Sequence, residues 1–437
     1  MRVIADLHIH SPYSRATSPR LSLPHLERWA RIKGIGILGT GDCTHPLWLG
    51  ELMRQTDEAG EGLYTIKKKF RDAGSAVPAA ETPRFVLTGE IAAIYKRDGK
   101  TRKVHHLVML PDFSAAIAFN ARLEGMGGNI RSDGRPILGM DSRDLLAMLM
   151  ETDERAVLIP AHIWTPWFSV LGAESGFDSI GECYGGMAAN IPAIETGLSS
   201  NPPMNWALES LDRFSIISNS DAHSPDKLGR EATIFEIENS FSSLRSALFS
   251  RSPSSPAAIL GTVEFFPQEG KYHYDGHRKC GVCLGPEAAR AADFLCPVCG
   301  KPLTRGVMSR VLELADRPVT EMEPFSPDRK TPSANRRPYY SLIPLSELCA
   351  ELLGLGPASK KVLAAYHHLI ENGGSEFSIL MDMNRPDLER LEAPGLSGEI
   401  LAEAIMKMRA GEVSVKPGYD GEYGRVGLAK CEANGEQ

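Results

Sequence analysis

Apolar runs followed by ionisable side chains recur along the first half of this chain, and this pattern restricts the fold more than any other feature. The motifs are DLHIH at residues 6–10, TGD at 40–42, TGE at 88–90, HHL at 105–107, PAH at 160–162 and SDAH at 220–223. Helix-like stretches alternate with these runs, which predicts an α/β protein whose site lies at the carboxyl ends of its strands. Burying so many ionisable groups without a metal or a paired charge would cost several kcal/mol each, so we expect a shared cation site.

The residue types in these motifs are typical ligands of transition metals. His8 and His10 are two residues apart at the end of a strand, so both imidazoles lie on one face and can bind the same ion. Histidine mixed with carboxylate suits Zn²⁺, Mn²⁺ or Fe, whereas an all-oxygen set suits Mg²⁺ or Ca²⁺. The candidate ligands are too many for one ion, so we predict two or three divalent transition-metal ions that share carboxylates such as Glu90 and Asp221. The expected reaction is phosphoester hydrolysis, which Mg²⁺ could also support.

In this order, the motifs resemble those of the PHP (polymerase and histidinol phosphatase) superfamily. The resemblance implies a distorted seven-stranded (β/α) barrel with a multinuclear metal site, which we place at residues 1–250. Between His105 and His106, the resemblance favours His106 because the family's histidine directly precedes two apolar residues, as His106 does here. The expected metal ligands are His8, His10, Asp42, Glu90, His106, His162, Asp221 and His223.

Two positions depart from the family's pattern. Asp42 stands where many members have histidine, and Tyr13, Ser14 and Arg15 stand where many carry another histidine. Asp42 can still bind metal, but the missing histidine leaves open whether a third ion is bound. His45 could replace the missing ligand or could simply begin a helix. Arg15 is a candidate phosphate clamp. The expected catalytic residues are Asp221, His8, His10, Glu90 and Arg15.

A second ligand pattern consists of two Cys-x-x-Cys pairs that are separated by 12 residues. Two such pairs place four thiolates around one Zn²⁺ ion, whereas a redox role would need a single pair beside a thioredoxin-like unit. With four protein ligands the zinc has no open position, so we expect a structural zinc ribbon at residues 262–306. Its expected ligands are Cys280, Cys283, Cys296 and Cys299.

Over nearly its full length the chain resembles the endonuclease Q family. The similar segments include PAHIWTPWFSVLG, IETGLSSNPPMNW, ISNSDAHSPDKLGREA, EGKYHYDGHRKCGVC and KPGYDGEYG. The resemblance implies a DNA-repair endonuclease that cleaves on the 5′ side of a deaminated base (deoxyuridine or deoxyinosine) or an abasic site. Damaged DNA is therefore the expected partner, and a mainly helical region at residues 307–437 is expected to bind it.

Two groups of side chains are candidates for DNA contact. A nuclease that inspects bases holds a flipped base between apolar walls, and Trp164, Trp167 and Phe168 follow His162 closely, although they could equally be core residues. Further along the chain, arginines alternate with tyrosines, a composition that is typical of nucleic-acid channels. The segment could instead be a solvated linker. These residues are Arg336, Arg337, Tyr339 and Tyr340.

Composition limits the remaining possibilities. The 48 basic and 55 acidic residues give a net charge of −7, so DNA would have to be held by a local basic surface. No apolar run approaches the length of a membrane span and the first residues lack a signal peptide, so we expect a cytoplasmic, nucleoid-associated protein. No sliding-clamp peptide is evident. Two alternatives stay open, namely a small-molecule phosphatase of the histidinol-phosphate kind and a non-catalytic DNA-binding protein.

Overall fold

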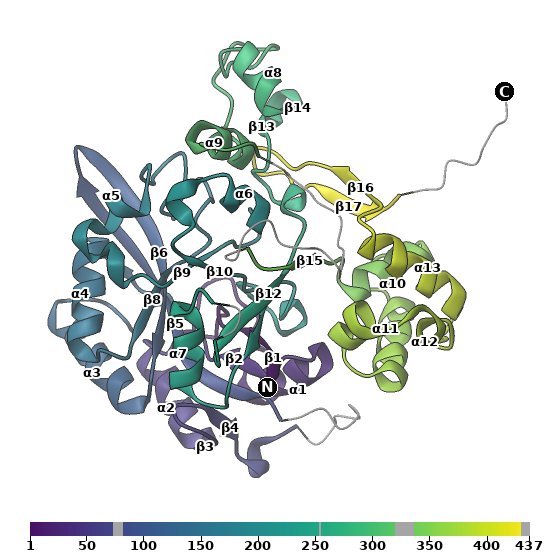
Figure 1. The fold of residues 1–437 in the computed structure, drawn as a ribbon, viewed down its shortest axis with the longest axis horizontal. Coiled ribbons are helices and arrows are strands. Elements are labelled where there is room, and N and C mark those ends of the chain that lie inside the picture. The colour runs from purple at the N-terminus through teal and green to yellow at the C-terminus, as the bar shows by residue number, and fades with distance from the viewer. Residues whose placement is uncertain (73–81, 253–254, 320–335, 430–437) are drawn as a thin grey trace.

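The computed structural model describes residues 1–72, 82–252, 255–319 and 336–429 (Figure 1). Its centre is a mixed sheet of eleven strands. These strands are β1 (Arg2–Asp6), β2 (Ile37–Gly39), β3 (Thr56–Glu58), β4 (Tyr64–Ile66), β5 (Arg84–Arg97), β6 (Lys100–Leu110), β7 (Ile137–Leu138), β8 (Val157–Pro160), β11 (Ala232–Glu236), β12 (Ala258–Glu264) and β15 (Tyr339–Ser341).

Hydrogen bonds join the strands in the order β15–β12–β11–β1–β2–β5–β4–β3, and β6, β7 and β8 are added through β5 and β6. β1, β2 and β5 are parallel neighbours, so the residues that follow β1 and β2 lie beside the middle of β5. β9 (Ala193–Glu195) and β10 (Ser215–Ile217) pair in parallel as a separate two-stranded sheet. The mixed α/β fold is as predicted, whereas the distorted seven-stranded barrel stays a prediction.

The middle of the main sheet is buried on both faces. In β1, Val3 and Ala5 pack in one apolar cluster and Ile4 packs in another, because successive side chains point to opposite faces. The first cluster includes α7 (Phe241–Phe249). The second includes α1 (Leu23–Lys33), α2 (Pro46–Gln55), α3 (Phe113–Gly125) and α4 (Ser142–Thr152).

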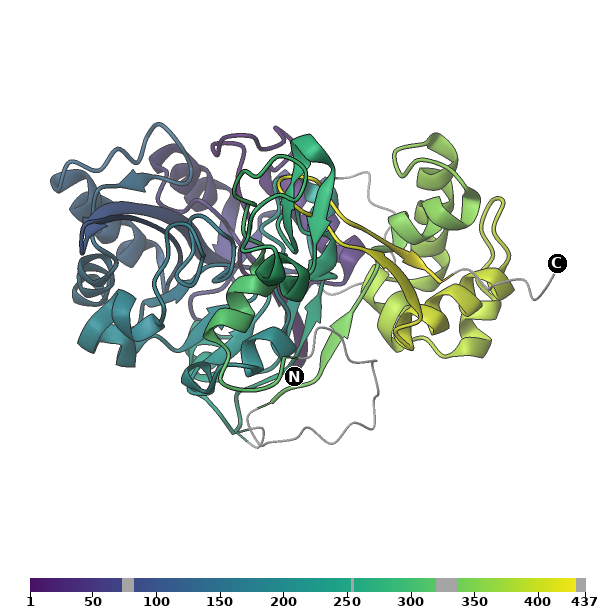
Figure 2. The same ribbon diagram turned by 90° about the horizontal axis from the view of Figure 1, so that it is seen from above.

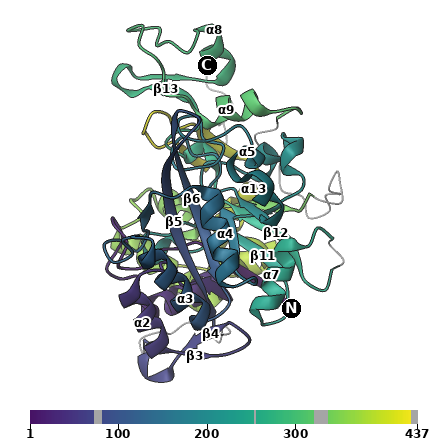
Figure 3. The same cartoon turned by 90° about the vertical axis from the view of Figure 1, so that its left-hand side faces the viewer.

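β5 and β6 form a long antiparallel hairpin that α3 and α4 flank (Figure 3). Its turn is Asp98–Gly99, where φ is 52° and 74°, as a two-residue type I′ turn requires. The pairing places Glu90 opposite Leu107 and Ala92 opposite His105. Residues 90, 92, 105 and 107 therefore share one face of the hairpin, and residue 106 lies on the other.

Two strands join the main sheet from beyond residue 250, the expected end of the first domain. β12 pairs antiparallel with β11, and β15 pairs parallel with β12. The sheet therefore includes parts of both regions that the sequence had assigned to later domains. Among the described residues, no helix has both the length and the apolar character needed to cross a membrane.

A small module projects at the top of Figure 1, and a group of helices lies to the right of the sheet in Figures 1 and 2. The module, which we call the ribbon, contains β13 (Asp275–His277), β14 (Val282–Leu284) and α8 (Pro286–Ala291), and α9 (Val307–Leu314) follows it. The helices are α10 (Leu345–Leu353), α11 (Lys360–Gly373), α12 (Arg385–Glu389) and α13 (Gly398–Arg409), followed by the hairpin of β16 (Val413–Lys416) and β17 (Arg425–Leu428). A buried ion pair of 2.7 Å between Lys33 and Glu376 joins these helices to α1. The short helices α5 (Ile180–Tyr184) and α6 (Pro202–Trp206) complete the fold.

Candidate metal centre and active-site cleft

A first group of metal donors forms where β1 ends. His8, His10, Glu90 and Asp221 each bring a nitrogen or oxygen atom within 4.8 Å of the others. His10 Nε2 lies 2.9 Å from Asp221 Oδ1 and 3.5 Å from Glu90 Oε2. His8, His10 and Glu90 are fully buried, and Asp221 is 28% exposed. The structure brings these four expected ligands together, and their binding of a metal stays a prediction.

A second donor group shares Glu90 with the first. It consists of Glu90, His105 and His162, again with the donor atoms within 4.8 Å of one another. Glu90 Oε1 lies 2.6 Å from His105 Nδ1 and 3.1 Å from His162 Nε2. Two donor groups that share one carboxylate could hold two neighbouring ions.

The structure corrects the choice between the two neighbouring histidines. His105 lies in the second donor group, whereas His106 contacts Ser142 Oγ (3.1 Å) and Tyr184 Oη (2.8 Å). The preference for His106 was wrong because strand alternation gives only His105 the face of β5–β6 that carries Glu90. Burial, with His105 nearby, lowers the pKa of His106 to about 3, so its ring is neutral.

Asp42 and His223 lie beside the donor groups and outside them. Asp42 Oδ1 is 3.2 Å from His10 Nδ1, and Asp42 Oδ2 accepts hydrogen bonds from the Ser11 amide (2.7 Å) and the Ser14 hydroxyl (2.9 Å). Asp42 therefore orients the His10 ring from behind, which corrects its prediction as a direct ligand. The His223 ring lies 4.5 Å from that of His10, and its Nδ1 lies 2.8 Å from the Asp221 backbone oxygen.

His45 lies outside both donor groups. It precedes the first residue of α2, its Nε2 lies 3.1 Å from the Arg131 backbone oxygen, and its ring stacks on Tyr13 at 4.4 Å. Of the two alternatives left open by the sequence, the helix-start role is therefore the one that the structure supports.

Sequence reasoning missed two residues that touch the donor groups. Both oxygens of Glu195 lie 3.0 Å from His8 Nδ1, and Glu195 also accepts a 2.8 Å hydrogen bond from the His162 amide. Arg135 Nη1 lies 3.2 Å from Glu90 Oε2. Glu195 ends a short apolar run, so the pattern that found the other ligands could have found it. Arg135 lies in a loop that offers no such signal.

The local charges suit a divalent cation. Burial opposes the ionisation of Glu90, but His105 and His8 outweigh it and hold the pKa of Glu90 well below its usual value. Burial likewise opposes the ionisation of Asp221, whose pKa is lowered by hydrogen bonding to His10 and by His8. Both carboxylates are thus ionised at physiological pH. Burial lowers the pKa of His10, but hydrogen bonds with Asp221 and Asp42 outweigh it and raise that pKa to about 10.

Several of these residues have a strained backbone. Asp42, His162 and Asp221 have φ values of 47°, 30° and 48°, in the left-handed region that residues other than glycine rarely occupy. Gly197 packs against His162 so closely that a Cβ atom there would lie 2.3 Å from the His162 Cβ. Strain of this kind persists where the surrounding structure holds functional side chains in place.

The donor groups open into a cleft of about 650 Å³. Its basic side chains are those of Arg15, Arg135 and Lys271, and the donors His105, His162 and Asp221 also line it. Aromatic rings form part of the wall: Trp167 lies 5.3 Å from Tyr272, and Phe168 lies 4.7 Å from His105. The remaining aromatic side chain of the lining is Tyr423 from the C-terminal hairpin.

Other residues proposed for DNA contact lie elsewhere. Trp164 is fully buried and donates a 2.8 Å hydrogen bond to Asn205 Oδ1, so it is a core residue. Arg336 stacks on Trp206, and Arg337 donates to the Arg251 backbone oxygen. Tyr339 and Tyr340 lie in β15, at the edge of the main sheet. The residues that line the cleft include none of these five.

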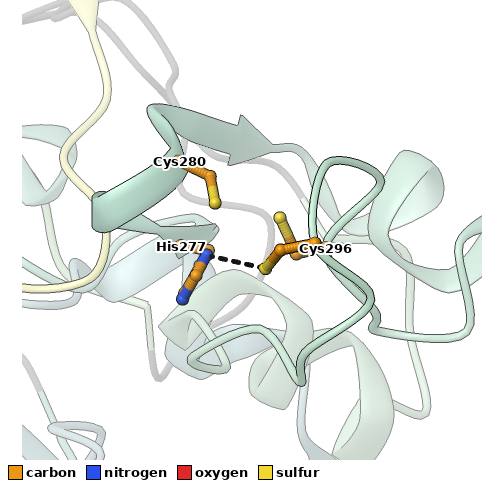
Figure 4. Close-up of side chains that lie close together, drawn as sticks. His277, Cys280 and Cys296 are labelled. Carbon is orange, nitrogen blue, oxygen red and sulfur yellow. Dashed lines mark hydrogen bonds between the residues drawn. The ribbon is translucent and has the colours of Figure 1, made fainter.

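The ribbon contains a separate group of donors. His277, Cys280, Cys296 and Cys299 bring their donor atoms within 4.8 Å of one another, and Cys299 Sγ lies 3.5 Å from His277 Nδ1 (Figure 4). Cys283 is outside this group, which corrects the prediction of four cysteine ligands. In β14 the side chain of Val282 packs into the small core of the ribbon, so that of the next residue, Cys283, points the other way.

The fold is similar to that of solved endonucleases. PfuEndoQ from Pyrococcus furiosus, a lesion-specific endonuclease, is 30% identical, with a TM-score of 0.81 over 98% of this chain and 96% of that one. The chain belongs to the endonuclease Q family. A complex of Endonuclease Q with a 27-mer duplex that has an abasic lesion at the active site is 31% identical, with a TM-score of 0.80 over 98% of this chain and 97% of that one.

Other relatives of this endonuclease Q family member are known by sequence. Protein YqxK of Bacillus subtilis is 28% identical over 97% of this chain and 99% of its own length. Protein MJ0043 of Methanocaldococcus jannaschii is 32% identical over 60% of this chain, which spans only 31% of that longer protein. The MJ0043 C-terminal domain family matches residues 344–412, which contain α10 to α13.

Proposed function

We propose that this protein is a DNA-repair endonuclease that hydrolyses the phosphodiester on the 5′ side of a deaminated base, deoxyuridine or deoxyinosine, or of an abasic site. The observation that carries the proposal is the pair of donor groups that share Glu90 beneath a cleft with basic and aromatic walls. The family relative solved with an abasic duplex supports the choice of substrate. A cleft of about 650 Å³ is large enough for one nucleotide.

The residues present fit divalent metal ions. His8 Nε2 is buried and has no hydrogen-bond partner among the described residues, as expected for an atom reserved for a metal. We propose that His8, His10, Glu90 and Asp221 hold one ion of Zn²⁺, Mn²⁺ or Fe, and that Glu90, His105 and His162 hold a second. Such ions supply a Lewis acid that lowers the pKa of water and offsets charge on phosphate oxygens.

The protein's own side chains would orient the reactants. Glu195 and Asp42 hold the His8 and His10 rings from behind through their Nδ1 atoms, which directs both Nε2 atoms toward the donor group. Asp221 is the most exposed donor of its group and faces the cleft, so it would also orient the attacking water. Arg15 and Arg135 line the cleft and would pair with phosphate oxygens.

We propose that the damaged nucleotide leaves the base stack and enters the cleft. Trp167, Phe168 and Tyr272 offer rings against which a base or a bare sugar can pack. The C-terminal helices would contact the duplex through the exposed turn between α10 and α11, where Lys360 and Lys361 begin the second helix. These local basic groups would hold DNA despite the net charge of −7.

We propose one structural Zn²⁺ ion in the ribbon. The apolar core of the ribbon consists of a few residues such as Val282, Ala289 and Leu303, which is too small to stabilise an independent fold. Binding of a metal by its donor group would therefore contribute folding free energy. We further expect the protein to act in the cytoplasm at the nucleoid.

The experiment is cleavage of end-labelled duplexes that contain one uracil, one hypoxanthine, one abasic site or none, with and without chelator. We expect nicking 5′ of the lesion that chelator abolishes and Mn²⁺, Zn²⁺ or Mg²⁺ restores. The Asp221→Asn variant should lose this activity. Hydrolysis of para-nitrophenyl phosphate without any nicking would instead support a small-molecule phosphatase, and DNA binding without any hydrolysis would support a non-catalytic protein.

A further inference from the structure

We infer that Asp133 is a positioning residue that holds Arg15 and Arg135, the two arginines of the cleft, as one clamp for the scissile phosphate. The inference rests on the proposed hydrolysis of a phosphodiester and names a residue that acts through two others. Both arginines lie in loops, Arg15 after β1 and Arg135 before β7, so neither is held in place by a helix or a strand of its own.

A single carboxylate contacts both arginines. Asp133 Oδ1 accepts hydrogen bonds from the backbone amides of Arg15 (3.3 Å) and Arg135 (3.2 Å). Asp133 Oδ2 lies 3.3 Å from Arg15 Nε. The Asp133 side chain is 9% exposed, whereas the Arg15 side chain is 75% exposed. The carboxylate is therefore nearly buried, while most of the Arg15 side chain stays accessible to a phosphate in the cleft.

The loops that carry Asp133 and Arg15 are joined beside the donor groups. The Gly134 amide donates a 3.0 Å hydrogen bond to the Tyr13 carbonyl. A Cβ atom at Gly134 would lie 2.3 Å from Asp42 Oδ2, so only glycine allows this close approach. The backbone next to Asp133 is thus fixed against the carboxylate that orients the His10 ring.

Arg135 extends from the same loop to the shared carboxylate of the donor groups. Its Nη1 lies 3.2 Å from Glu90 Oε2, and its side chain is 28% exposed in the lining of the cleft. The Ala92 amide donates a 3.0 Å hydrogen bond to the Pro136 carbonyl, which attaches the residue after Arg135 to β5. The loop therefore presents Arg135 from a backbone that Asp133 holds on one side and β5 on the other.

A carboxylate in a cleft that binds a phosphate needs a physical reason, because two negative charges repel each other. The oxygens of Asp133 are occupied by two amides and one guanidinium, which offsets much of that repulsion. Arginines that are held in advance can stabilise the charge of the transition state without first being ordered by the substrate. A misplacement of about 1 Å can slow an enzyme by about 100-fold, so the position of both arginines matters for the rate.

The same local turn occurs outside the cleft and provides a matched control. Asp153 Oδ1 accepts a 2.9 Å hydrogen bond from the Arg155 amide, two residues further on, and lies 3.0 Å from Arg155 Nε. The residues that line the cleft do not include Asp153 or Arg155. If Asp133 served only to form its turn, replacing either aspartate would have the same effect on cleavage.

The test measures single-turnover nicking of a duplex with one abasic site by the full-length, Mn²⁺-loaded protein at saturating concentration. Asp133→Ala should nick about 100-fold more slowly with unchanged Mn²⁺ content. Asp133→Asn should lose less activity, because its Oδ1 can still accept from both amides. Asp153→Ala should nick like the wild type. Wild-type nicking by Asp133→Ala would overturn the inference, and so would tighter duplex binding with undiminished nicking in both Asp133 variants, which would indicate a simple charge effect.

A double-mutant cycle tests whether Asp133 acts through Arg15. In the Arg15→Ala background, one of the two side chains that Asp133 positions is already gone. The further change Asp133→Ala should therefore slow nicking by only about 10-fold or less. The same factor in both backgrounds would overturn the inference, because it would mean that Asp133 acts independently of Arg15.

Hydrogen exchange followed by mass spectrometry gives a measurement that needs no activity. In Asp133→Ala the amides of Arg15 and Arg135 lose their acceptor, so the peptides that contain them should exchange faster than in the wild type. Asp153→Ala should leave these peptides unchanged. Unchanged exchange in Asp133→Ala would overturn the positioning role. Exchange as expected in a wild-type protein that nicks no duplex would instead refute the proposed endonuclease activity, so the two failures are distinguishable.

Discussion

Replacing Glu195 with glutamine tests whether the metal donors depend on a residue that binds no metal itself. Glu195 accepts a hydrogen bond from His8 Nδ1–H, with both oxygens at 3.0 Å, so the lone pair of the neutral His8 ring resides on Nε2. A glutamine amide could instead donate to Nδ1. The proton of the imidazole would then move to Nε2, the atom proposed to bind metal.

The expected loss is moderate and specific. Removing a carboxylate that orients a metal-binding histidine typically costs about 10-fold to 100-fold in metal affinity, which corresponds to about 1.4–2.8 kcal/mol. Glu195 also accepts hydrogen bonds from the His162 amide and from Asn219, both at 2.8 Å, and glutamine can keep only some of these. We therefore expect the upper part of that range.

A matched control is available in the same region. Glu264 is equally buried and contacts Ser218, but burial raises its pKa to about 8, so it is already neutral at pH 7. Glu264→Gln should leave Mn²⁺ affinity, measured by calorimetry at pH 7, and nicking of an abasic duplex unchanged. If Glu195→Gln binds Mn²⁺ and nicks like the wild type, the role assigned to Glu195 is wrong.

Three further predictions follow from the placement of single residues. His105→Ala should lose one bound ion and most nicking, whereas His106→Ala should keep its metal content and lower the melting temperature, because His106 joins Ser142 and Tyr184 in the core. Trp164→Ala should lower the free energy of unfolding by about 3–5 kcal/mol. Trp167→Ala should change the free energy of unfolding by less than about 0.5 kcal/mol. The Trp167→Ala variant should also bind lesion-containing duplexes more weakly in a fluorescence anisotropy titration. Because burial raises the pKa of Glu264 from 4.5 to about 8, the folded protein retains a proton that the unfolded chain releases between these values. The contribution of Glu264 to stability should therefore fall from pH 4.5 to 8 and level off above, so Glu264→Gln should gain melting temperature relative to the wild type across that range.

The sequence predicted those site residues whose position depends on local geometry. His8 and His10 are two residues apart, and a strand places such residues on one face whatever the rest of the chain does. Asp221 and His162 follow apolar runs in the same way.

The errors arose where the answer depended on pairing register. His105 and His106 are adjacent, so only the pairing of β6 with β5 decides which one meets Glu90. Likewise, the Cys-x-x-Cys spacing is compatible with a metal knuckle, but the pairing of β13 with β14 turns Cys283 outward. Such contacts join residues distant in sequence, and a single sequence without its pairing partners carries no signal for them.

The segment from Lys416 to Gly424 connects the ribbon and the C-terminal helices to the wall of the cleft. Asp420 binds the ribbon at Arg278 and Thr304, and the next amide, that of Gly421, donates a 2.9 Å hydrogen bond to the Lys271 carbonyl at the cleft wall. At its far end the hairpin reaches the C-terminal helices, where the Leu428 amide donates to Glu351 at 2.9 Å. Because Lys271 and Tyr423 both line the cleft, the wall they form is held by contacts with the ribbon and with the helices. The ribbon therefore need not touch the reacting phosphate to matter for cleavage, since loss of its fold would release one side of the cleft.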